Sequence, residues 1–109
     1  MFTVEDTKLG NLKIYFRHVH DPDNTIEIAT YDEDGEPKGS YLIKAITSCI
    51  VEDGLENEIA IAQSHCSVKD NFSRERGRKT ALLRAVQQIF DREKEVEERQ
   101  KIWDAYFEI

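Results

Sequence analysis

The sequence of 109 residues has only two cysteines, Cys49 and Cys66, and they do not form a CxxC pair. A disulfide framework of the kind found in small secreted domains is therefore not indicated. His18 and His20 lie two residues apart, but no further His or Cys pair completes a metal site with them. We expect reduced thiols, no metal or other cofactor, and a cytoplasmic protein.

Long apolar runs are also absent. No stretch approaches the roughly 18 residues that a membrane-spanning helix needs. The N-terminal segment MFTVEDTK is charged and has no signal-peptide core. The length suits one domain with a single modest core. We expect one domain over residues 1–109, β-rich from 1 to 66 and helical from 70 to 109.

The sequence lacks the common catalytic motifs. It has no Gly-rich phosphate loop, no GxSxG and no HExxH. The acidic run at Asp32–Gly35 is too short for a calcium loop and lacks its terminal glutamate. His65 and Cys66 are adjacent on a predicted strand, so they point to opposite faces and do not form a nucleophile pair. We expect that the protein is not an enzyme.

Positive charge is scarce, because 15 Lys and Arg residues face 22 Asp and Glu residues, for a net charge of −7. This balance argues against general binding to nucleic-acid backbones, which needs a positive surface. It permits a solvated surface, a basic protein partner, or mimicry of nucleic acid.

The first two-thirds of the chain has the pattern of strands. Apolar and polar residues alternate at Leu12–Arg17 and again at Thr25–Ile28. Tyr41–Val51 is β-branched and almost continuously apolar, and Asn57–Cys66 follows after a turn. The Gly- and Asp-rich segment Asp32–Ser40 is predicted to be an exposed hairpin loop. These connections are too short for helical crossovers, so we predict an antiparallel meander.

After Cys66 the apolar period becomes helical, and Asp70 or Ser73 can cap the helix start. The helical stripe consists of Ala81, Leu82, Ala85, Val86 and Ile89. A charged segment and an aromatic close follow, as one long helix or as two. The predicted fold is α+β: an antiparallel β-meander of four or five strands with one or two C-terminal helices packed on one face.

Most of a cationic cluster coincides with the predicted helix start. The segment KDNFSRERGRKTALLRA, Lys69–Ala85, contains six basic and two acidic residues. Each exposed cation in a first helical turn opposes the helix dipole by roughly 0.3–1 kcal/mol. A bound anion would reverse this effect, because helix N–H groups and guanidinium groups would both face it.

Helical geometry separates the arginines of this segment. Arg74 and Arg78 project along the face that should meet the sheet, whereas Arg76 points away into solvent. Arg84 lies on one flank of the stripe. A guanidinium between helix and sheet needs a charged partner. That partner is either a bound anion or a sheet glutamate: Glu27, Glu52 or Glu58.

Three further residues are candidates for the same site. Phe72, beside Asn71, can stack on a base or act as a hydrophobic staple of the helix. Gly77 indicates close approach of a backbone, a ligand or a second subunit, or a helix that begins later. Arg17 or His18 would line the pocket if the first strand neighbours the helix start.

The segment from Ile61 through Ile89, with CSVKDNFSRERGRKTALLRAVQQI as its core, resembles a pattern in small phage-encoded proteins. Together with the upstream β-meander it resembles the phage anti-Thoeris sponge family. Members of that family sequester the cyclic ADP-ribose isomer that a bacterial Thoeris system makes as an alarm signal. The strong part of the match covers about a quarter of the chain.

The resemblance implies an anti-defence protein in the host cell cytoplasm that binds a cyclic nucleotide tightly without cleaving it. It also implies a homodimer or a higher homo-oligomer. The purine of such a ligand can stack on an aromatic ring, and its two phosphates can pair with arginines. The ligand-binding residues expected on this basis are Asn71, Phe72, Arg74, Arg78 and Arg84, with Arg17 added from the first strands.

Two other functions remain open at the level of sequence. One is an acidic phage anti-CRISPR or other anti-defence inhibitor that blocks a host protein's nucleic-acid-binding site. The other is a phage oligomerisation module, for which Trp103, Tyr106 and Phe107 would matter most.

Overall fold

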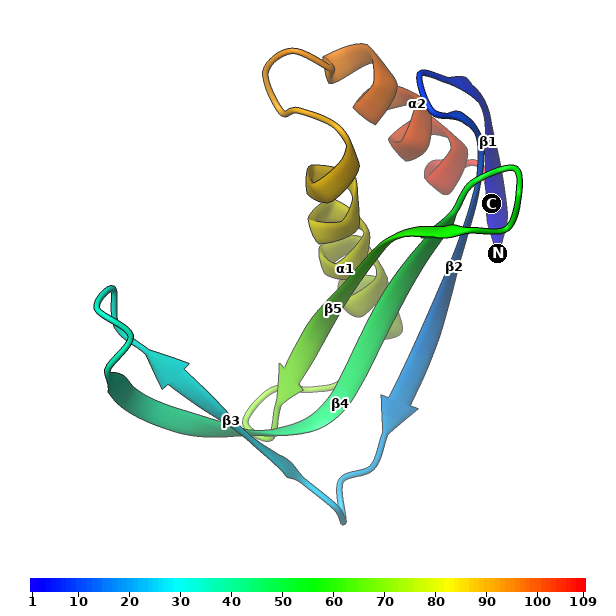
Figure 1. Ribbon diagram of the computed structural model, residues 1–109. Coiled ribbons are helices and arrows are strands. Elements are labelled where there is room, and N and C mark those ends of the chain that lie inside the picture. The colour runs from blue at the N-terminus through cyan, green and yellow to red at the C-terminus, as the bar shows by residue number, and fades with distance from the viewer.

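The computed structural model describes residues 1–109 and contains five strands followed by two helices (Figure 1). The elements are β1 (Phe2–Thr7), β2 (Gly10–His20), β3 (Ile26–Tyr31), β4 (Pro37–Glu52), β5 (Glu58–Ser67), α1 (Arg74–Ile89) and α2 (Val96–Phe107). All strand pairs are antiparallel and follow a meander-like order. The predicted α+β fold is confirmed. Neither helix has the length and apolar character needed to cross a lipid bilayer.

Strand β4 is the centre of the sheet. Ile43 of β4 pairs with Ile26 of β3 and with Ser67 of β5, so β3 and β5 lie on opposite edges of β4. Strand β2 pairs with the rest of β4, from Ala45 to Glu52, and β1 lies outside β2. Strands β2 and β3 therefore follow one another along the same edge of one long strand.

The hairpin between β3 and β4 is longer than the sequence predicted. Pro37–Ser40, expected in a loop, already belongs to β4 and pairs with the end of β3. Only the turn remains, where the Asp32 carboxylate accepts the N–H groups of Asp34 and Glu36, each at 2.9 Å. Cross-strand pairing thus overrides the weak strand propensity of Gly and Pro.

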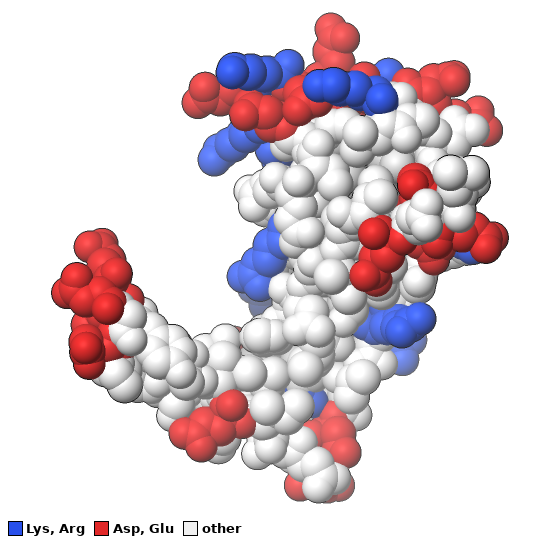
Figure 2. All heavy atoms as spheres, viewed as in Figure 1, with Lys and Arg blue, Asp and Glu red and all other residues white.

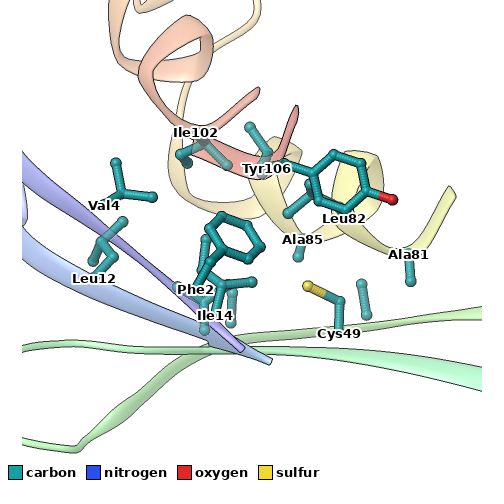
Figure 3. Close-up of a cluster of buried hydrophobic side chains, with 14 of the residues drawn as sticks. Phe2, Val4, Leu12, Ile14, Cys49, Ala81, Leu82, Ala85, Ile102 and Tyr106 are labelled. Carbon is teal, nitrogen blue, oxygen red and sulfur yellow. The ribbon is translucent and has the colours of Figure 1, made fainter. Parts of the chain in front are cut away.

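Both helices cover one face of the sheet, and the hydrophobic core lies between the helices and that face (Figure 3). The predicted helical stripe is confirmed, because Ala81, Leu82, Ala85 and Val86 are fully buried. The two alanines let α1 lie close to β4, where Cys49 is also fully buried. The helix α1 therefore packs closely against the central strand.

The C-terminal region forms two helices, not one. Phe90 is buried and ends α1, and the Asp91 carboxylate then accepts the N–H groups of Glu93 and Lys94, each at 2.8 Å. The chain turns there, and α2 packs against β1 through Ile102 and Tyr106. The Tyr106 ring lies 5.9 Å from the Phe2 ring, which ties the last helix to the first strand.

Side chains of α1 bind the outer edge of β5. Arg84 Nη1 donates to the carbonyl of Gln63 at 2.7 Å, and Gln88 Nε2 donates to the carbonyl of Ile61 at 2.8 Å. These carbonyls are two residues apart on a strand whose only partner is β4, so both point to the free edge. The helix therefore covers a face of the sheet and also binds part of its edge.

Candidate functional site

A pocket of about 320 Å³ lies where the start of α1 meets β4 and β5. It is built by the loop after β5, the first turns of the helix and the inward side chains of both strands. Its lining residues are Tyr41, Ala45, Thr47, Ser64, His65, Cys66, Asp70, Asn71, Phe72, Ser73, Arg76, Gly77, Thr80 and Arg84. Hydroxyl, amide and guanidinium groups outnumber apolar ones, so the pocket suits a polar ligand.

Gly77 sets the shape of this pocket. It is buried against β4, and a Cβ built on it would overlap Thr47 Oγ1 and lie 3.0 Å from Thr47 Cβ. Of the readings that the sequence left open, the structure therefore shows close backbone approach. The contact also divides the helix start into two sides, one facing the pocket on β5 and one facing β2.

The pocket side carries two arginines. Arg84 is held by its bond to the Gln63 carbonyl, whereas Arg76 makes no side-chain hydrogen bond and no ion pair. The Ser73 hydroxyl caps the helix by accepting the Arg76 N–H at 3.3 Å. The positive end of the helix dipole and two guanidinium groups thus border the same pocket, and Asp70 is the only carboxylate in the lining. This arrangement favours an anion.

His65 also lines the pocket, and its pKa is affected by the Arg84 charge. Partial burial, together with the Arg84 charge, lowers the pKa of His65. Its Nδ1 lies 3.4 Å from the Tyr41 hydroxyl, which also lines the pocket. The lowered pKa favours the neutral imidazole, which can exchange a hydrogen bond with the Tyr41 hydroxyl or with a ligand.

Phe72 belongs to both sides of the helix start, because it lines the pocket and also contacts β2. Its ring stacks on His20 at a centroid distance of 4.4 Å and meets His18 edge-on at 6.2 Å. His18 Nδ1 lies 2.8 Å from Thr47 Oγ1. Burial, followed by the charges of Arg74 and Arg78, lowers the pKa of His18. On the helix, Arg74 and Arg78 lie on the side of the Gly77 contact opposite to Arg76 and Arg84, so they fall on the β2 side.

The structure divides the predicted site residues into two groups. Asn71, Phe72 and Arg84 line the pocket. Arg74 and Arg78 do not, because the helix contacts the sheet through Gly77 and these two arginines fall on its β2 side. They also lack the proposed glutamate partner, since no carboxylate lies within 4.0 Å of either.

Arg17 lies on the other face of the sheet. Its neighbours Phe16 and His18 pair with Cys49 and Thr47, which face the helix. By strand alternation Arg17 points away from α1, and its guanidinium lies 5.6 Å from the Tyr15 ring centroid. It does not line the pocket.

The sequence reasoning missed several pocket residues. Arg76 is exposed, as predicted, yet it lines the pocket from the β5 side. Thr47 and Ser64 are paired neighbours on β4 and β5. The signal for them was the interruption of inward apolar rows by small polar residues, Ala45-Thr47-Cys49 on one strand and Ala60-Ala62-Ser64 on the other.

No three His, Cys, Asp or Glu side chains are grouped in a way that could hold a metal ion. Both cysteines are free, with Cys49 in the core and Cys66 in the pocket lining. Comparison of the chain with protein families, with curated proteins and with solved structures finds no match.

Proposed function

We propose that the protein binds a small phosphorylated nucleotide in the pocket at the start of α1 and holds it unchanged. The single observation that carries this proposal is the convergence of Arg76 and Arg84 with Tyr41 and Phe72 around one cavity at a helix N-terminus. Guanidinium groups and the helix start serve the phosphates, and aromatic rings serve the base.

The cavity volume supports one nucleotide-sized ligand. Small-molecule sites occupy roughly 300–1,000 Å³, and this pocket, at about 320 Å³, lies at the lower end. Its hydroxyl groups, from Thr47, Ser64 and Thr80, are suited to ribose and phosphate oxygens. A compact cyclic nucleotide fits this description better than an extended dinucleotide.

The segment that resembles the anti-Thoeris sponges supplies most of the lining, including Cys66, Asn71, Gly77 and Arg84. The ligand we propose is accordingly a cyclic ADP-ribose-type signal. The biological role would be that of a phage anti-defence protein in the host cytoplasm. By mass action it would lower the free concentration of the signal below the threshold of the effector.

Calorimetric titration tests this proposal with cyclic ADP-ribose isomers and with linear ADP-ribose as the comparison. We expect Arg76→Gln to weaken binding by about 10- to 100-fold, because a charge-assisted hydrogen bond contributes about 1.5–3 kcal/mol. Arg92→Gln removes an exposed arginine outside the pocket and serves as the matched control. Ligand released by denaturing the loaded protein should have an unchanged mass.

The proposal fails if none of these nucleotides binds. It also fails if Arg76→Gln and Arg92→Gln bind with the same affinity as the unaltered protein. A released product with a new mass would show that the ligand is converted and not merely held.

A further inference from the structure

Strand β3 and the first part of β4 form a two-stranded arm, residues 26–42, that projects from the rest of the molecule (Figure 1). The arm raises the radius of gyration to 15.6 Å, whereas a compact chain of this length has about 13 Å. A β-ribbon of only two strands has little stability of its own in water. In the pairing of the sheet, the arm is joined to the other strands only through β4, and contact with a further surface would stabilise it.

Apolar side chains of the arm are open to solvent. Ile26, Tyr31 and Leu42 expose 48, 62 and 45% of their surface. Val19, at the end of β2 beside the arm, is 62% exposed. Ile26 pairs with Ile43, and Leu42 pairs with Glu27, so strand alternation places Ile26 and Leu42 on opposite faces of the arm. Each face of the arm therefore exposes apolar surface.

The tip of the arm is acidic. Figure 2 shows a dense group of Asp and Glu residues there on the face in view. Asp32 is used to hold the turn, but Glu33, Asp34 and Glu36 are exposed and their side chains make no hydrogen bond or ion pair. The tip therefore presents three free carboxylates to a cationic partner.

The same chain carries a cationic group without a partner. Arg74 and Arg78 lie on the β2 side of the helix start, outside the pocket, with no carboxylate within 4.0 Å. Arg74 lies in the first turn of α1, where a cation opposes the helix dipole, and Arg78 follows one turn later. Carboxylates brought to this position would pair with both guanidinium groups.

We propose that the arm docks on a second copy of this chain, with Glu33, Asp34 and Glu36 of one protomer placed against Arg74 and Arg78 of its partner. One chain holds both complementary groups, so a two-fold axis forms each contact twice. The apolar side chains on one face of the arm, including Ile26, are buried in the same contact. This dimer is independent of the proposed ligand, because none of these five residues lines the pocket.

Sedimentation equilibrium of the full chain, over the micromolar range and at low salt, tests the dimer. The unaltered protein should sediment as a dimer. The triple change Glu33→Lys, Asp34→Lys and Glu36→Lys should give a monomer with an unchanged circular dichroism spectrum. The double change Arg74→Glu and Arg78→Glu should do the same. Combining all five changes restores opposite charges and should restore the dimer.

The matched control reverses three exposed carboxylates elsewhere, Glu5→Lys, Glu97→Lys and Glu108→Lys, and should remain a dimer. Several outcomes would overturn the proposal: an unaltered protein that is monomeric throughout, a charge-reversed arm that still dimerises, or a combined variant that stays monomeric. In the last case the arm would bind a surface other than the two arginines.

Discussion

Gly77 is the residue at which the helix start touches the central strand. Any larger side chain there must displace Thr47, whose hydroxyl lies 2.8 Å from His18 Nδ1. The glycine lowers helix propensity by about 1 kcal/mol relative to alanine. In return it permits the close contact that forms one wall of the pocket and separates the two groups of arginines.

We expect Gly77→Ala to lower the free energy of unfolding by about 1–2 kcal/mol. Overpacking against Thr47 costs about 1–3 kcal/mol, and the gain in helix propensity offsets part of it. Urea unfolding measures the change. Gly54→Ala is the control, because its Cβ would meet only Asn11 O at 4.0 Å, and should change stability by less than about 0.5 kcal/mol. Equal losses in both variants would contradict the close contact.

The two cysteines should differ in reactivity. Burial raises the pKa of the Cys49 thiol to about 12, and its side chain is fully buried. Cys66 lines the pocket and is only partly buried. Since the thiolate is the reactive form, we expect iodoacetamide at pH 8 to alkylate Cys66 in the folded protein, and Cys49 only after unfolding.

Peptide mass spectrometry identifies the alkylated cysteine. Cys66→Ser should leave the folded protein unlabelled, whereas Cys49→Ala should retain the label. Comparable rates for both thiols in the folded protein would show that the core around Cys49 is open.

At the scale of elements, α2 is the part whose position depends most on distant residues. Its charged sequence continues the helical pattern of α1, so the pattern alone did not divide one helix from two. The division comes from Asp91, whose carboxylate binds the next turn, and from the docking of Ile102 and Tyr106 on β1. That docking joins residues about a hundred positions apart, which no local pattern can report.

Docking through Ile102 should be a main source of stability for this element. Ile102 is fully buried, so we expect Ile102→Ala to lower the free energy of unfolding by about 2–5 kcal/mol. Val96→Ala, at a position on the same helix that is 57% exposed, should change it by less than about 0.5 kcal/mol. Guanidinium chloride unfolding compares the two, and similar losses would mean that α2 does not dock as described.

At the scale of the whole molecule, the fold class and the helical stripe were predictable because they follow from local periodicity. The site was predictable only in part. Asn71, Phe72 and Arg84 line the pocket, whereas Arg74 and Arg78 fall on the far side of the Gly77 contact. An ideal helix projection gives the relative angles of side chains but not the line along which the helix meets a twisted sheet.

The pocket residues from the strands could not be located from sequence for a different reason. Tyr41, Thr47 and Ser64 come together through the register of β4 and β5. A shift of one residue would turn each side chain to the opposite face. The long arm was likewise missed, because Pro37–Ser40 has weak strand propensity and becomes a strand only by pairing with β3.

The bonds from Arg84 and Gln88 to the outer edge of β5 have a consequence for how chains can associate. A free strand edge is a template on which another chain can add a strand, and repeated addition leads to fibres. Here two carbonyls of that edge are already bound by the helix, so an incoming strand would have to displace both side chains. These two bonds therefore hinder strand addition at this edge of the sheet.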